Sequence, residues 1–144
     1  MAIVGFYFDK INVERLEPLK GQISIKNDIK LKNVEKDTIS LSKENKSEVI
    51  LIRFEFSTTY EPKIGFLNIL GHVSYLVNEK EAKEILNGWK KDKKLPSDMT
   101  IKVLNFIFSK ATIMALKMTE EVGLPPQIQL PSLKPKTDVS GYIG

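Results

Sequence analysis

The hydrophobic residues of this chain change their spacing once, from every second position in the first half to every third or fourth position in the second half. A period of two is the side-chain repeat of a strand with one buried face, and a period near 3.6 is that of a helix. The sequence therefore predicts an α+β domain, in which a four-stranded antiparallel sheet is packed with a short and a long C-terminal helix.

The strand pattern occupies four segments, and these span residues 4–13, 23–32, 49–59 and 64–77. In the first segment, Val4, Phe6 and Phe8 share one parity, and the parity changes at Asp9 and Lys10. A change of parity predicts a β-bulge, which moves the following side chains to the other face. Short connections between consecutive segments favour antiparallel neighbours.

Two helices are predicted after the last strand. Asn78 stands three residues before Glu81, the spacing of a capping box, and predicts the start of the first helix. The lysines at 90, 91, 93 and 94 end this helix. Pro96 begins the second, longer helix. Gly123 is predicted to follow the last turn of that helix in the left-handed backbone conformation.

The longer helix is apolar around most of its circumference. One sheet covers only one side of a helix, so the remaining apolar surface needs another partner. A second copy of the chain is the natural supplier, and the helix therefore predicts a homo-oligomer. The residues expected at this oligomer interface are Ile101, Phe106, Ile113 and Met114.

The length of 144 residues fits a single domain that spans residues 1–144. Its strand-rich part covers residues 3–77 and its helical part covers residues 78–123. The composition then changes, because four prolines fall within the next twelve residues. Since proline interrupts helices, residues 124–144 are predicted to form an extended, proline-bearing tail.

The chain contains no cysteine and one histidine. This excludes disulfides, thiolate metal sites and cysteine nucleophiles. His72 lies within an apolar strand pattern, where a structural or surface role is expected, and no metal-binding or phosphate-binding motif is present. We therefore expect no catalytic residue, no metal and no cofactor, and we predict a binding protein rather than an enzyme.

Neither a membrane segment nor a secretion signal is predicted. The longest apolar stretch, residues 103–118, is interrupted by Asn105, Ser109 and Lys110. The first residues lack the charged segment that precedes the apolar part of a signal peptide. The lack of cysteine also fits a reducing compartment, so we expect a cytoplasmic protein without membrane insertion.

The positive charge of the chain comes almost wholly from lysine. Lysine and arginine total 22 against 18 acidic residues, and Arg15 and Arg53 are the only arginines. Proteins that read bases favour arginine for bidentate contacts, so we do not expect nucleic acid as a specific partner. Aromatic residues at strand spacing stack on bases in some RNA-binding sheets, although neighbouring Ile and Val favour core packing here. Those aromatic residues are Phe6, Phe8, Phe54 and Phe56. A nucleic-acid-binding or other small oligomeric binding module is the alternative function.

Two stretches of sequence carry a family resemblance. Residues 49–58, Val-Ile-Leu-Ile-Arg-Phe-Glu-Phe-Ser-Thr, are followed by Gly65-Phe66-Leu67, and residues 123–131 read Gly-Leu-Pro-Pro-Gln-Ile-Gln-Leu-Pro. The first stretch is similar to the central hairpin of the preprotein-export chaperone SecB and its SecB-like relatives. The second resembles the ending Gly-x-x-Pro-x-(apolar)-x-Leu-x-Pro of that family. With the two helices, the resemblance spans most of residues 3–133.

This resemblance implies a molecular chaperone of the holdase type, connected with protein transport. Such a protein holds unfolded or nascent polypeptides in an apolar groove between the sheet and the long helix, without catalysis. The family forms dimers that pair into tetramers, so the resemblance also implies one of these homo-oligomers. The client-binding residues that it implies are Phe54, Phe56, Leu124, Ile128 and Leu130.

The charge of the chain departs from the SecB pattern. SecB proteins that serve the SecA motor present an acidic sheet surface, whereas Lys10 and Lys63 lie near positions where the resemblance implies acids. The family's Pro-Tyr-x-Arg sequence at the start of the long helix is also missing. A partnership with SecA is therefore not expected, and a general holdase or one with a particular client fits the sequence better.

Overall fold

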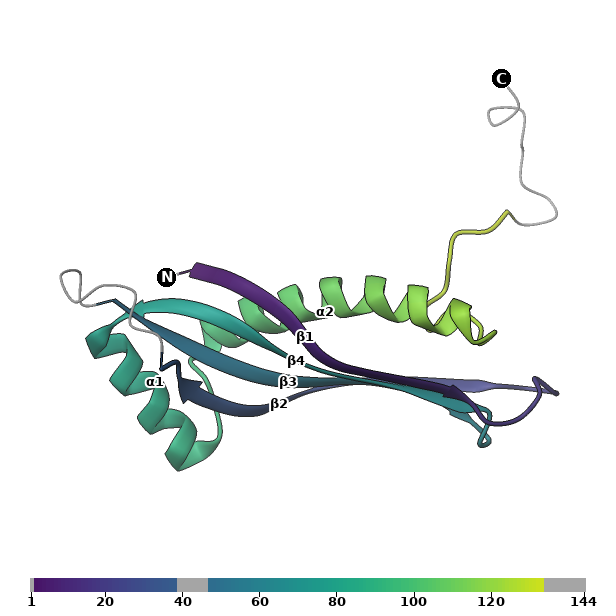
Figure 1. Ribbon diagram of the computed structural model, residues 1–144, viewed down its shortest axis with the longest axis horizontal. Helices are drawn as coiled ribbons and strands as arrows, with labels where there is room; N and C mark the ends of the chain where they lie inside the picture. Colours follow the sequence, from purple (N-terminus) through teal and green to yellow (C-terminus); the bar gives the residue numbers. More distant parts are fainter. Residues whose placement is uncertain (1, 39–46, 134–144) are drawn as a thin grey trace, which may run out of the picture.

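The computed structural model describes residues 2–38 and 47–133, and the predicted tail beyond residue 133 lies outside these ranges. Four strands are followed by two helices, so the predicted α+β class is confirmed (Figure 1). The elements are β1 (Ala2–Arg15), β2 (Ser24–Lys36), β3 (Ser47–Glu61), β4 (Gly65–Asn78), α1 (Glu79–Asp92) and α2 (Ser97–Glu121).

The strands form one antiparallel sheet in the order β1-β4-β3-β2, which leaves β1 and β2 at its two edges. Along β3 and β4 the side chains alternate between buried and half-buried or exposed, as the period of two predicts. The buried parity joins residues of both helices in one core. The fully buried strand residues of this core include Ile50, Ile52, Phe54, Phe56, Leu67, Ile69, Val73 and Val77.

Two β-bulges adjust the path of β1 along β4. The register shifts between Phe8 and Lys10, which confirms the bulge that the parity change predicts. A second shift lies between Ile3 and Gly5. Because of it, Ile3 packs on the core, whereas Val4 is 53% exposed. The expectation that Val4 shares a face with Phe6 and Phe8 is therefore wrong.

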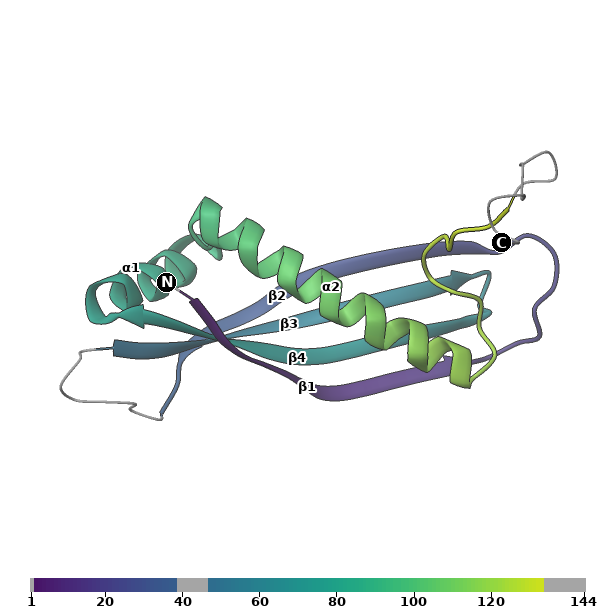
Figure 2. The same cartoon turned by 90° about the horizontal axis from the view of Figure 1, so that it is seen from above.

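The helices cover different parts of the sheet. Figure 2 shows α2 running obliquely over the strands, and α1 packing near the sheet end where β4 finishes. Helix α1 contacts β2, β3 and β4, whereas α2 contacts β4 and β1. The buried stripe of α2 consists of Met99, Val103, Ile107, Ala111, Ala115 and Thr119. By length and composition alone α2 could also cross a membrane, although the core helix of a globular protein meets the same criterion.

The start of α1 provides a test of local stability. The backbone N–H of Glu81 donates to the side-chain oxygen of Asn78 at 2.8 Å, and the Asn78 amide donates to the Glu81 carboxylate at 3.1 Å. Replacing Asn78 with alanine removes both contacts, so we expect the free energy of unfolding to fall by about 1 kcal/mol. Urea denaturation measures this change. Asn78→Asp keeps the acceptor for the backbone N–H and is the matched control, and an equal loss in both variants would contradict the capping role.

Candidate functional site

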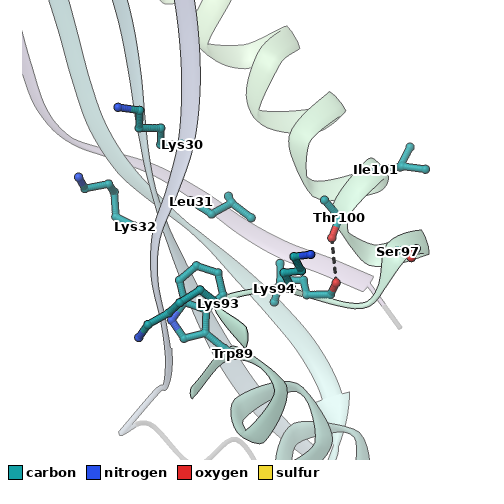
Figure 3. Close-up of a pocket in the computed structure, with 10 residues that line it drawn as sticks. Lys30, Leu31, Lys32, Trp89, Lys93, Lys94, Ser97, Thr100 and Ile101 are labelled. Carbon is teal, nitrogen blue, oxygen red and sulfur yellow. Dashed lines mark hydrogen bonds between the residues drawn. The ribbon is translucent and has the colours of Figure 1, made fainter. Parts of the chain in front are cut away.

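An open groove of about 840 Å³ lies where the edge strand β2, the end of α1 and the start of α2 meet (Figure 3). We name it the Trp89 groove. Its lining combines apolar side chains with lysines and two hydroxyl groups, and consists of Lys30, Leu31, Lys32, Trp89, Lys93, Lys94, Leu95, Ser97, Thr100 and Ile101. The groove is therefore apolar at its base and basic at its border.

One wall of the groove is the free edge of the sheet. Among residues 2–38 and 47–133, strand β2 pairs with β3 on one side only. In Figure 3, Leu31 points toward the helices, whereas Lys30 and Lys32 point to the opposite side of the strand. An unpaired edge offers backbone N–H and C=O groups to an extended chain, which can bind as an additional strand.

The base of the groove contains the only tryptophan of the chain. Trp89 ends the buried face of α1 and is 6% exposed. Its indole nitrogen is buried and has no hydrogen-bond partner among the residues that the structure describes. A buried N–H without an acceptor costs free energy, so the Trp89 side chain contributes less stability here than its apolar packing alone would give.

The residue that follows α1 has an unusual backbone conformation. Lys93 is in the left-handed region, with φ 56° and ψ 37°, and its N–H donates to the Trp89 carbonyl at 2.8 Å. Glycine is the residue that normally fills this position at a helix end. The Lys93 side chain extends beside Trp89, with its ammonium 5.8 Å from the ring centroid (Figure 3). The backbone turn thus places a cation at the border of the groove.

The opposite end of the sheet is closed by the segment after α2. We name residues 122–128 the C-terminal strap. Gly123 has φ +77° and ends α2, as predicted. In Figure 2 the chain after α2 runs across the strands toward the β2 edge. Hydrogen bonds fix its path, because Arg15 of β1 donates to the Val122 carbonyl and Asn27 of β2 donates to the Gln127 carbonyl, both at 2.9 Å.

Tyr60 of β3 anchors the middle of the strap. Its buried hydroxyl donates to the Pro125 carbonyl at 2.5 Å. Burial raises the pKa of the Tyr60 hydroxyl above 10, and the neighbouring Thr119 hydroxyl opposes part of this rise. The folded pKa therefore exceeds the unfolded one. The stability that this difference represents is complete below about pH 10 and is lost as the pH rises through the folded pKa.

We accordingly expect the free energy of unfolding to decrease more steeply above about pH 10 in the parent protein than in the Tyr60→Phe variant. The variant should be less stable at neutral pH by about 1 kcal/mol, because the Pro125 carbonyl loses its donor. Denaturant unfolding of both proteins between about pH 8 and pH 11 checks this. Lysines titrate in the same range in both proteins, so the difference between the two curves isolates Tyr60. Parallel curves would exclude its contribution.

The comparisons with known proteins concern the whole arrangement of sheet and helices. No family model matches this chain, and no curated protein matches it. Among solved structures, it is similar to the SecB-like chaperone Rv1957 of Mycobacterium tuberculosis, in complex with a ChAD peptide from the antitoxin Rv1956 HigA1. The TM-score is 0.58 at 10% sequence identity, over 94% of this chain and 92% of the other. The chain has the SecB-like fold. The fold that the sequence resemblance implies is thereby confirmed.

Within this SecB-like fold, the predicted client-binding residues fall into two groups. Phe54 and Phe56 are 1% exposed and belong to the core beneath the helices, and Leu124 is 5% exposed. These side chains offer no surface to a client in this arrangement. Ile128 is half-buried and Leu130 is 48% exposed. Leu130 and Leu124 line a second cavity, of about 510 Å³, between the strap and α2.

The burial of the sheet aromatics also affects the alternative function. Phe54 stacks on Phe6 with ring centroids 5.3 Å apart, and Phe6 in turn contacts Phe106 of α2 at 5.5 Å. Rings that pack on one another under a helix are not available for stacking on bases. The observation removes the main sequence argument for RNA binding by this sheet.

The four residues predicted at an oligomer interface are also divided. Ile101 and Ile113 lie on the outer side of α2 and are 63% and 55% exposed. Phe106 and Met114 are half-buried and pack toward the sheet of the same chain. Phe108, which the sequence analysis does not place at the interface, is 47% exposed. The outer side of α2 therefore presents apolar surface, through a partly different set of residues.

The Trp89 groove is absent from the sequence-based predictions. Its residues come from three elements that are distant in the sequence, and periodicity does not show which helix end meets which strand edge. One signal was present. A single tryptophan directly precedes the run Lys90-Lys91-Asp92-Lys93-Lys94, which places a large apolar ring next to concentrated positive charge.

The outer face of the sheet carries a cluster of charged residues. Asp9 accepts from His72 at 2.8 Å, and Arg53 pairs with Glu35 at 2.6 Å. Tyr7 stacks on the His72 ring with centroids 5.0 Å apart. Among the described residues, no group of His, Cys, Asp or Glu is placed to hold a metal ion.

Proposed function

We propose that this protein is a SecB-like molecular chaperone, a holdase that binds unfolded or nascent polypeptides without catalysing a reaction. The observation that carries the proposal is the Trp89 groove, which combines apolar side chains with the free edge of β2. The similarity in fold to a chaperone that holds an antitoxin peptide supports polypeptide as the kind of ligand. A cytoplasmic site of action and the absence of SecA as a partner belong to the same proposal.

The physical mechanism needs no reactive group. Burying apolar client side chains against Leu31 and Ile101 contributes about 25 cal/mol for each Å² removed from water. Hydrogen bonds between the client backbone and the β2 edge add affinity that does not depend on the client's sequence. Both contributions suit a protein that holds many extended segments, and neither requires a cofactor.

A homo-oligomer, dimer or tetramer, completes the proposal. Outside the groove, the exposed apolar residues on α2 are Phe108 and Ile113. Apolar surface of this kind on a helix is normally covered by a partner. We propose that this partner is a second copy of the chain. Sedimentation velocity measures the mass of the resulting oligomer.

Holdase activity is tested by diluting a chemically unfolded protein into buffer with the chaperone and following light scattering. We expect aggregation to be suppressed at a severalfold molar excess of the chaperone. The Ile101→Gln variant should lose most of this suppression, because it places a polar side chain at the border of the groove. Glutamine keeps the helix propensity, so folding should be unaffected.

Ile113→Gln is the matched control, since Ile113 is also more than half exposed on α2 but does not line the groove. We expect this variant to suppress aggregation as the parent does, provided that sedimentation shows the same mass for both. If both variants lose the same amount of aggregation suppression and both sediment with a different mass from the parent, the loss would result from altered oligomer assembly. No suppression by the parent protein would exclude the holdase function.

A further inference from the structure

We propose that the Trp89 groove is selective for client segments in which apolar residues are flanked by aspartate or glutamate. This inference rests on the proposed polypeptide-binding function and specifies its substrate class. It follows from the charge of the groove border and from the conformation of Lys93.

The border of the groove carries charge of one sign. Four of its ten lining residues are lysines and none is acidic. The ammonium of Lys30 lies 3.7 Å from Asp28, which neutralises part of its charge. Within residues 2–38 and 47–133, no ion pair involves Lys32, Lys93 or Lys94. Lys30 and Lys32 extend to the opposite side of β2 (Figure 3), so Lys93 and Lys94 are the two cations available to a ligand that brings carboxylates into the groove.

The opposite side of the helix junction has the reverse charge. A cavity of about 370 Å³ between α1 and α2 is lined by Glu81, Glu84 and Asp98, with Lys102 as its single cation. Charge is therefore segregated around the place where the two helices meet. An acidic client segment is attracted to the basic border of the Trp89 groove. In the acidic cavity the same segment would be repelled, so the two sites differ in their affinity for it.

Lys93 supports the same conclusion through its backbone. A left-handed conformation is unfavourable for a residue with a Cβ atom, and glycine would fill this helix end with less strain. Strained positions of this kind concentrate at functional sites. Here the strained residue holds its ammonium beside Trp89. Lysine at this position therefore adds a positive charge to the groove, although glycine would make the helix end more stable.

Three fluorescent peptides with the same apolar centre and acidic, neutral or basic flanks test the proposal by fluorescence anisotropy. We expect the acidic peptide to bind roughly tenfold more tightly than the basic one at low salt, since exposed charge pairs contribute modestly. The difference should shrink at about 0.5 M salt, where screening is strong. Equal affinities, or tighter binding of the basic peptide, would overturn the charge selectivity while leaving polypeptide binding intact.

Two variants connect the selectivity with the groove. Lys93→Gln should bring the affinities of the three peptides closer together, whereas Lys110→Gln should not. Lys110 is a suitable control because its ammonium also lies over an aromatic ring, 5.7 Å from the Phe106 centroid, but outside the groove. Lys93→Gly should lose selectivity without a lower melting temperature, which separates the charge effect from misfolding. Unchanged selectivity in both Lys93 variants would overturn the assignment to this groove.

The remaining outcomes concern the nature of the ligand. A labelled single-stranded oligonucleotide that binds more tightly than the acidic peptide would identify nucleic acid as the preferred polyanion and overturn the assignment to polypeptide. Failure of all three peptides to bind, together with no suppression of aggregation, would exclude the chaperone function itself. The two failures are therefore distinguishable.

Discussion

Replacing Gly71 with alanine is expected to lower the free energy of unfolding by about 3 kcal/mol, or to prevent folding. Gly71 lies in the middle of β4, opposite Phe8 of β1 and Phe54 of β3. An added Cβ atom would overlap the backbone carbonyl of Tyr7 and would lie 2.6 Å from the Phe54 ring. The ring can rotate only slightly, because it is buried and stacked on Phe6. The neighbouring strand would have to move away instead.

The matched control is Gly88→Ala in α1. A Cβ atom there would meet only the Lys94 carbonyl, at an ordinary distance of 3.7 Å. Since alanine is the better helix former, this variant should be more stable by about 1 kcal/mol. Thermal and urea unfolding of both variants check the pair of predictions. Destabilisation of similar size in both would contradict the close packing around Gly71.

Replacing Phe54 with alanine is expected to cost about 3–5 kcal/mol of stability, the range for a large aromatic residue removed from a packed core. Phe54 is 1% exposed, contacts Phe6 through stacked rings and fills the space above Gly71. The sequence resemblance implies that this residue touches clients, whereas its burial indicates that it supports the sheet. Unfolding experiments distinguish these roles, because a client-contact residue on the surface contributes little to stability.

Leu130→Ala is the comparison for Phe54→Ala. Leu130 belongs to the same implied client-binding set but is 48% exposed. We expect its stability to change by less than about 0.5 kcal/mol. If Phe54→Ala unfolds at the same denaturant concentration as the parent, the proposed core around the Phe6 and Phe54 rings is incorrect.

Much of the fold follows from local rules that can be applied to the sequence. The alternation along β3 and β4 predicts which side chains are buried, because successive residues of a strand face opposite sides. The cap at Asn78 and the left-handed Gly123 depend on their immediate neighbours alone. The bulge after Phe8 is visible because it reverses the parity of the apolar residues. Each of these predictions is confirmed.

Other features depend on how distant elements meet. The bulge beside Val4 leaves no parity signal, since the residues on both sides of it are apolar. Alternation assigns Phe54 and Phe56 to the inner face, but it does not predict that α2 and the first strand cover them completely. The Trp89 groove requires the end of α1 to lie beside the edge of β2, a relation between residues about 60 positions apart. Periodicity within one segment contains no information of that kind.

The C-terminal strap has a consequence for the synthesis of the chain. Its hydrogen bonds join Arg15 to Val122 and Asn27 to Gln127, pairs separated by 107 and 100 residues. Contacts between such distant residues close late and slow the folding of a domain. Tyr60 and Ile64 cannot complete their small core until Leu124 has left the ribosome, because Leu124 is its third buried member. One end of the sheet therefore stays incompletely packed for nearly the whole of translation. During that time the nascent chain exposes apolar surface of the kind that the folded protein is proposed to bind in its clients.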